Sequence, residues 1–413
     1  MHKLGPSLTH SLPALALCSA VALAACGGGG GGGGGGFVPT GSSSGTANST
    51  GNLRVAMTDA PACGFDNVYV TVEKIRVHGN ADEDTGSSGW SDITLSSPRR
   101  IDLLSLTNGV ITTLGQTPLP AGTYQQIRLV LSANTANNQL ANAVVPTGGA
   151  ELALDTPSAV QSGIKIIRPF TVAADSLTDL VLDFDACKSI VTRGNGSYGL
   201  KPVVTALPTT VSGNVTGVLA GAPGARVFAE RNGVVVKSTV ADTNGNFNLS
   251  PIEQSSTAGP VDVVIVPTVA NGRATGIIRD VPVTAGSSTA LATTANPISL
   301  PTSAVRKVSG VVAPASAQAT LRALQQSGSR TFEIAAVAAN IDSGAYAFFS
   351  TQPALPAGPP VVGSYQATLP IPLTADSAAA GKYSIQATST TGTVGTRQVD
   401  VTSGDLVDQN FSF

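Results

Sequence analysis

Charged and aromatic residues are scarce in this chain of 413 residues. Asp, Glu, Lys and Arg make up 12% of it, aromatic residues make up 4%, and the formal net charge is −2. No basic patch indicates a nucleic-acid partner, and no acidic run indicates a cationic one. Sugar-binding platforms use exposed aromatic rings, so the composition does not favour a lectin.

Histidine is also rare, which restricts the chemistry that the chain can support. Of its three histidines, only His78 lies beyond the first 25 residues. No Gly-x-Ser-x-Gly motif joins a strand to a helix, and no Cys-x-x-Cys pair is present, so neither a nucleophilic hydrolase nor a metal site is predicted. Asp183 and Asp185 alternate along one expected strand, and we interpret them as its solvent-facing side, with Leu182 and Phe184 inward. We therefore predict no catalytic residue and no enzyme.

Residues 1–25 resemble a bacterial lipoprotein signal peptide. Ser11–Ala25 is uncharged and apolar but too short to span a bilayer. It ends in Leu23-Ala24-Ala25-Cys26, which resembles a lipobox. The resemblance implies cleavage before Cys26, acylation of Cys26 and anchoring to a membrane. Gly27 after the cysteine implies the outer membrane, with the protein facing the periplasm or the outside. A plain signal peptide cut after Ala25 is the alternative.

Residues 26–51 are expected to form a flexible tether. Ten consecutive glycines, Gly27–Gly36, precede a Gly/Ser/Thr-rich stretch without an apolar period. A flexible chain of about 25 residues has a mean reach of roughly 27 Å, enough to separate a folded body from lipid headgroups. Low-complexity expansion without a selected length is the alternative, and it also leaves the segment disordered.

Two cysteines remain for pairing if Cys26 carries lipid. Cys63 and Cys187 would then lie in an oxidising compartment, and we predict that they form a disulfide. The chain-entropy estimate for closing so long a loop is roughly 5 kcal/mol. Two buried free thiols are the alternative.

Strand patterns dominate the chain after the tether. Val68, Val70 and Val72 share one face, and the apolar phase then shifts to Ile75 and Val77, which predicts a β-bulge near Glu73-Lys74. Other strands are expected at 53–57, 90–95, 125–132, 151–154, 164–172, 179–184 and 201–206, with a polar hairpin loop at 79–89 and one short helix within 103–114. The pattern predicts an all-β sandwich or barrel-like domain over residues 52–207.

An ordered series of motifs in this region resembles a known family. The motifs are MTDAP (57–61), VYVTVEKIRVH (68–78), IDLLSL (101–106), LPAGTYQQIRLVL (119–131), SGIKIIRPFTV (162–172), LDFDACKSI (182–190) and LKPVV (200–204). Together they look like the bacterial lipoprotein family known as domain-of-unknown-function family 4382. The resemblance implies a fold and an extracytoplasmic setting and no reaction.

The remainder of the chain reads as an internal repeat. "VSG" opens one segment at 211–213 and another at 308–310, and ADTNGNFNL (241–249) parallels NIDSGAYAF (340–348). We expect two tandem antiparallel β-sandwich modules, 208–302 and 306–413, the second carrying an insertion. They resemble carboxypeptidase-regulatory-like, transthyretin-like sandwiches, which implies a spacer or binding scaffold. Asp242 and Gly245 are interpreted as a tight structural turn rather than a calcium loop.

Four acidic residues are the candidate cation ligands of the chain. Asp82, Glu83 and Asp84 in the hairpin loop, together with Asp59, could gather a hard cation such as calcium, while a solvated loop tip is the simpler interpretation. No other cofactor is expected. The sequence thus predicts a lipid-anchored cell-envelope protein with a non-enzymatic binding or structural role and a surface polymer or protein as partner. A calcium-assisted adhesin or glycan-binding protein is the alternative, followed by an envelope enzyme.

Overall fold

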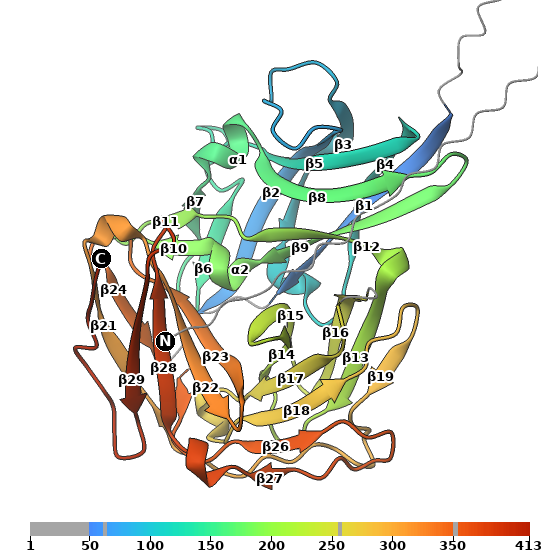
Figure 1. The fold of residues 1–413 in the computed structure, drawn as a ribbon. Helices are drawn as coiled ribbons and strands as arrows, with labels where there is room; N and C mark the ends of the chain where they lie inside the picture. The colour runs from blue at the N-terminus through green and yellow to red at the C-terminus, as the bar shows by residue number, and fades with distance from the viewer. Residues whose placement is uncertain (1–48, 61–63, 255–257, 350–353) are drawn as a thin grey trace, which may run out of the picture. The chain divides into compact units, whose positions relative to one another are not determined.

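The computed structural model describes residues 49–60, 64–254, 258–349 and 354–413, and these are almost entirely β-structure (Figure 1). The predicted all-β class is confirmed. The chain divides into two units, Met1–Ala47 and Asn48–Phe413, and all described residues belong to the second. The expected signal peptide, the glycine run, Cys26 and Cys63 lie outside the described residues.

Two sheets enclose the core formed by the N-terminal part of the described chain. The four-stranded sheet has the order β12 (Val204–Pro208), β9 (Leu177–Asp185), β1 (Thr50–Ala60), β4 (Thr112–Pro120). The larger sheet has the order β10 (Ile190–Thr192), β11 (Tyr198–Leu200), β7 (Leu152–Asp155), β6 (Ala143–Pro146), β2 (Phe65–His78), β5 (Gly122–Leu131), β8 (Ile164–Val172), with β3 (Ser91–Asp102) also paired to β2.

The phase shift in β2 is a β-bulge, as predicted. The register of β2 with both β3 and β5 shifts between Val72 and Lys74, so Glu73 is the extra residue. The apolar residues on either side of it, Val68, Val70, Val72, Ile75 and Val77, are all fully buried. The bulge therefore keeps both halves of one long strand facing the same core.

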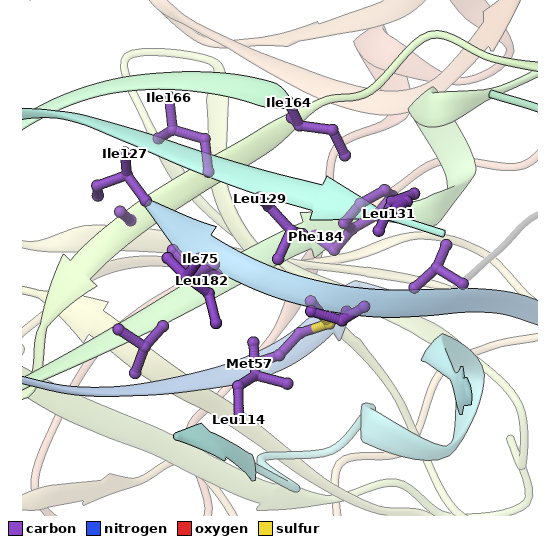
Figure 2. Packing of buried hydrophobic residues seen from close by; sticks show 14 of the residues in the cluster. Met57, Ile75, Leu114, Ile127, Leu129, Leu131, Ile164, Ile166, Leu182 and Phe184 are labelled. Atoms are coloured by element: carbon purple, nitrogen blue, oxygen red, sulfur yellow. The ribbon is translucent and has the colours of Figure 1, made fainter. Parts of the chain in front are cut away.

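Figure 2 shows this core from close by, with side chains from both sheets pointing toward one another. Met57 of β1 and Leu182 and Phe184 of β9 come from one sheet, while Ile75 of β2 and Ile127 of β5 come from the other. The alternation of apolar and polar residues along each strand places every second side chain in this space.

The short helix expected within residues 103–114 is present as a 3₁₀ helix at the start of this range. Only Leu103–Leu106 forms a short 3₁₀ helix (η1), and β4 begins at Thr112. Asn108 and Gly109 between them have φ values of 59° and 79°, in the left-handed region that ends a right-handed helix. Two short helices were not predicted: α1 (Pro157–Gln161) and α2 (Ala186–Ser189), the latter capped by the Asp185 carboxylate, which accepts from the Lys188 N–H.

Two parts of the chain, one within 208–302 and one within 306–413, share one strand topology. In the first module, β16 (Asn246–Glu253), β13 (Ser212–Val218) and β19 (Ser288–Ala290) form one sheet, and β15 (Val234–Val240), β14 (Arg226–Arg231), β17 (Val261–Val266) and β18 (Gly276–Val281) adjoin in another. The second module repeats both orders with β24 (Ala345–Phe348), β21 (Val308–Ala313) and β30 (Phe411–Ser412), and with β23 (Arg330–Ala338), β22 (Thr320–Ser327), β28 (Lys382–Thr388) and β29 (Val394–Asp400). Short 3₁₀ turns connect strands at η2 (Thr209–Val211), η3 (Val269–Asn271), η4 (Ala315–Ala317) and η5 (Ser377–Ala379).

The register of the two opening strands differs from the prediction by four residues. Gly217 of β13 pairs with Phe247, and Gly310 of β21 pairs with Tyr346. The "VSG" at 308–310 therefore corresponds to Val215-Thr216-Gly217 and not to the "VSG" at 211–213. Backbone pairing decides this correspondence, because each glycine pairs with the equivalent aromatic residue of the neighbouring strand.

The turn that ends each hairpin requires glycine. Gly245 and Gly344 have φ values of 83° and 70°, and an added Cβ would collide with the carbonyl oxygens of Leu219 and Val312, respectively. In the first module the Asp242 Oδ1 accepts hydrogen bonds from the N–H groups of Asn244 and Asn246, each at 2.8 Å. These bonds confirm the interpretation of a structural turn.

The insertion of the second module joins the sheet of the first. β26 (Val361–Ser364) pairs in parallel with β18, and β27 (Thr374–Ala375) continues that sheet, while β25 (Leu355–Pro356) pairs with β20 (Val305–Arg306). Val361 and Ile371 of the insertion are buried in the core of the first module. Among the described residues, no helix is long and apolar enough to cross a membrane.

Candidate binding groove

Four strand edges border a groove of about 400 Å³. β8 and β12 are the last strands of the two N-terminal sheets, and β15 and β16 are the last strands of two sheets of the first module. Each of the four therefore has one side without a neighbouring strand among the described residues. The apolar lining residues include Ile166, Ile167, Val204, Leu207, Val235 and Val236, and the charged ones are Lys165, Arg168, Asp183, Arg231 and Glu253.

Proline marks three of these edges. Pro169 lies in β8, Pro208 ends β12, and Pro251 lies in β16. Because proline has no N–H to donate to a ladder, it is confined to edge strands and bulges. These prolines are the sequence signal from which the groove could be located.

Two large apolar side chains of the groove are exposed to solvent. Ile167 of β8 is 51% exposed, and Val236 of β15 is 39% exposed. Each lies on an edge strand beside the open side of its sheet. Apolar surface next to open strand edges is typical of a recognition site.

The charged residues on the groove wall are organised by an ion pair. Arg168 of β8 and Glu253 of β16 form a salt bridge, so the pair links the N-terminal sheets to the first module. The Arg231 guanidinium donates at 2.6 Å to the Glu253 carbonyl oxygen. Lys165 reaches only the exposed Asp82, at 3.9 Å. Lys165 thus has only a long ion pair, and Arg231 forms no salt bridge among the described residues.

Asp183 lies at the groove and differs from its predicted setting. Its Oδ1 accepts from the Lys237 Nζ of β15 at 2.6 Å, and Lys237 is almost fully buried. Burial raises the pKa of Asp183, and the neighbouring ammonium opposes that effect. The prediction that Asp183 lies on a solvent-facing side of its strand is wrong. β9 pairs in parallel with β1, and β15 covers this part of β9. The inward positions of Leu182 and Phe184 are confirmed.

Asp59 does not join the acidic hairpin loop. It is buried at the end of β1, where its Oδ1 accepts from the Ala186 N–H at 3.2 Å. Burial, together with Asp185 and Asp183, raises the pKa of Asp59 well above its usual range. The four predicted cation ligands are therefore not brought together, since strand pairing fixes Asp59 beside β9.

The loop between β2 and β3 is held by side chains from the strands beneath it. The Gln126 Nε2 donates to the carbonyl oxygens of Asn80 and Ala81, at 3.1 and 2.9 Å. The Trp90 indole N–H donates to the Asp84 carbonyl at 2.8 Å. The carboxylates of the loop diverge: the Asp82 side chain is 95% exposed, and Glu83 accepts from the Asn80 side chain. Within the described ranges, no three His, Cys, Asp or Glu side chains gather as a metal site.

His78 packs against Trp90 rather than against a nucleophile. The ring centroids lie 5.1 Å apart, and the Arg76 guanidinium lies 5.0 Å from the centroid of the Trp90 ring. The His78 Nδ1 accepts from the Asn80 N–H at 2.9 Å. This histidine therefore helps to shape the hairpin loop.

Cys187 lies in α2, two residues after the end of β9. Its predicted partner, Cys63, and the lipidation site, Cys26, fall outside the described ranges, so the disulfide and the anchor stay predictions. The last described residue before Cys63 is Ala60, at the end of β1, and it pairs with Asp185.

Residues 50–202 match the protein-family model described as "Domain of unknown function (DUF4382)". The chain thus contains a DUF4382 domain, and the predicted resemblance of residues 52–207 is confirmed. No curated protein matches the chain.

Several solved structures show weak similarity. A Ca²⁺-stabilised adhesin that helps an Antarctic bacterium bind ice is 11% identical, with 87% of this chain and 75% of that chain covered and a TM-score of 0.15. The minor pilin GBS52 of Streptococcus agalactiae is 10% identical, with 60% and 96% covered and a TM-score of 0.14. The T6 backbone pilin of Streptococcus pyogenes is 9% identical, with 85% and 80% covered and a TM-score of 0.15. TM-scores this low do not establish a shared fold.

Proposed function

We propose that this chain is a lipid-anchored cell-envelope protein with a non-enzymatic binding or structural role at the cell surface. The observation that carries the binding role is the groove of about 400 Å³ bordered by four open strand edges. Its lining combines exposed Ile167 and Val236 with charged side chains, which suits the recognition of a surface polymer or another protein. The DUF4382 domain and the two C-terminal modules, 208–302 and 306–413, act as the scaffold.

The anchor in this proposal is Cys26 within Leu23-Ala24-Ala25-Cys26. Radiolabelled palmitate should enter the wild-type protein and a Cys18→Ser control but not Cys26→Ser. In a detergent phase split, the wild type should enter the detergent phase and Cys26→Ser the aqueous phase. Label retained by Cys26→Ser, or a wild type found in the aqueous phase, would contradict the anchor.

The location is tested on intact cells. Protease added outside should release peptides from residues 49–413, which mass spectrometry identifies, if the folded body faces the outside. Release only after the outer membrane is permeabilised would place the body in the periplasm and contradict the surface role. A periplasmic protein of known location serves as the control for cell integrity.

We also propose the disulfide between Cys63 and Cys187. Ala60 pairs with Asp185; Cys63 follows Ala60 by three positions in the sequence, and Cys187 follows Asp185 by two, which supports the pairing. Peptide mapping without reductant should recover one peptide pair containing both cysteines; alkylation of both thiols in the unreduced protein would refute the bond.

The calcium-assisted adhesin remains a separate hypothesis that depends on the hairpin loop at 79–89. Calcium and a chelator should leave the melting temperature unchanged if the loop is held by Gln126 and Trp90 alone. A calcium-dependent shift that Asp82→Asn abolishes would favour the adhesin reading. An envelope enzyme would instead reveal itself in a substrate screen by turnover that Asp183→Ala removes.

A further inference from the structure

The open edge of β12 offers main-chain hydrogen-bonding groups to the groove. β12 pairs with β9 in an antiparallel ladder, and the Asp185 N–H donates to the Val203 carbonyl at 2.9 Å. Residues of an antiparallel strand alternate between the two sides, so Thr205 and Leu207 bond to β9. Val204 and Ala206 then direct their N–H and C=O groups away from β9.

No hydrogen bond of these groups on that side is found among the described residues, and both residues line the groove, Val204 half-buried and Ala206 4% exposed. Their spacing of two residues, about 6.8 Å, is the repeat with which another extended main chain presents its own donors and acceptors. Pro208 ends β12, so the open edge is short.

We propose that the groove takes an extended segment of a partner polypeptide, which adds as a strand to the open edge of β12. The inference rests on the proposed binding role and names the class of partner. Main-chain hydrogen bonds supply affinity in this mode, and pockets for alternate side chains supply specificity. Ile167 of β8 and Val236 of β15 provide the apolar walls for such side chains.

The charges on the groove wall specify the partner further. Asp183 is paired with Lys237, and Glu253 is paired with Arg168. Lys165 and Arg231 remain as cations at the groove. The complementary segment therefore carries an acidic side chain among apolar ones.

The test uses a phage-displayed library of random twelve-residue peptides selected on the purified full-length chain. Selected peptides should share apolar residues at alternate positions and an acidic residue. Ala206→Pro removes the outward N–H and leaves the bonds from β12 to β9, so peptide affinity should fall about tenfold. Gln116→Ala, which alters an exposed side chain on β4 at the opposite edge of the same sheet and outside the groove, is the control and should bind like wild type.

Two further measurements keep the proposal falsifiable if Ala206→Pro does not fold. Ile167→Glu places a charge on the apolar wall and should also weaken the selected peptides about tenfold. Hydrogen exchange should show the Val204 and Ala206 amides protected on peptide binding. Peptides that bind Ile167→Glu as tightly as wild type, or that leave both amides exchanging as before, would overturn strand addition.

A glycan array probed with the same protein distinguishes the binding role of the groove from the proposal that its partner is a polypeptide. Glycan binding that Ile167→Glu weakens, with no peptide enriched, would preserve the binding role and refute a polypeptide partner. Loss of palmitate labelling and of surface exposure would instead refute the proposed function, whatever the peptides show.

Discussion

The two C-terminal modules share one strand order and differ in the residues that each contributes to the core of the other. The first module receives Val361 and Ile371 from the insertion of the second, and the core of the second includes Phe228 and Val264 from the first. Each module therefore completes its partner's core. Repetition of a topology does not make the copies independent units.

The same pair of modules also differs at one equivalent position next to a bulge. β14 and β22 both change register at a bulge, between Ala229 and Glu230 in the first and between Ala323 and Leu324 in the second. Glu230 is fully buried there, and its Oε2 accepts from the Glu333 N–H at 3.1 Å. The first module thus carries an ionisable group at the position where the second carries a leucine.

The largest expected effect is loss of the aromatic ring that covers the opening strand. Phe247→Ala and Tyr346→Ala should each lower the free energy of unfolding by about 3–5 kcal/mol, because both rings are buried against a glycine strand. Urea unfolding measures both. Tyr346→Phe should cost only about 1 kcal/mol, the hydrogen bond that Tyr346 donates to the Gln409 carbonyl. A large loss of unfolding free energy from only one of the two alanine substitutions would contradict the structural equivalence of the modules.

A substitution in the insertion should destabilise the other module. Ile371→Ala should cost about 2–4 kcal/mol, since its side chain is buried in the core of the first module. Hydrogen exchange should then accelerate in β18, with β28 of the second module unchanged. Pro372→Ala, the next residue along the insertion, is the control. Faster hydrogen exchange in β28 alone would contradict the packing of the insertion into the core of the first module.

The turn glycines should respond alike. Gly245→Ala and Gly344→Ala should each cost about 2–3 kcal/mol, because alanine is strained at positive φ and its Cβ would meet a carbonyl oxygen. Thermal unfolding measures the change, with Gly286→Ala, which has a positive φ and open space, as the control for strain alone. Equal losses of stability from Gly245→Ala and Gly286→Ala would show that the contact between the added Cβ and the carbonyl oxygen contributes nothing to the destabilisation.

Glu230 should also give the first module a pH dependence that Leu324 does not give the second. Burial raises the pKa of Glu230 well above its usual range, so the folded state holds this proton more tightly than the unfolded state. The stability that the group contributes is present below its unfolded pKa near 4.3 and is lost as pH rises. Glu230→Gln should therefore gain stability relative to wild type by up to about 1.4 kcal/mol per pH unit above that value, until the folded pKa is reached.

Urea titrations between pH 4 and pH 9 measure that difference. Leu324→Ala at the equivalent position should lower stability by the same amount at every pH, because it removes no titrating group. A difference between Glu230→Gln and wild type that stays constant with pH would refute a raised pKa.

Local pattern predicted much of the N-terminal domain. The phase shift from Val72 to Ile75 located the bulge, and period-two alternation placed Leu182 and Phe184 in the core. The expected short helix is confined to Leu103–Leu106, and Asn108 and Gly109 after it adopt left-handed backbone, which apolar spacing does not report.

Local sequence patterns predicted less of the candidate groove. Asp183 was singled out, but its burial depends on Lys237, which lies 54 residues away in another module. Arg168 and Glu253, 85 residues apart, were not recognised at all. Prolines 169, 208 and 251 marked edge strands, yet only the folded chain brings those edges to one groove.

The sequence by itself determined the all-β class and the turn chemistry, because each depends on residues a few positions apart. The tertiary structure decided the four-residue offset between the opening strands, the exchange of segments between the modules and the groove of open edges. Those features depend on backbone pairing and burial between residues far apart in the chain, where no local period constrains which strands meet.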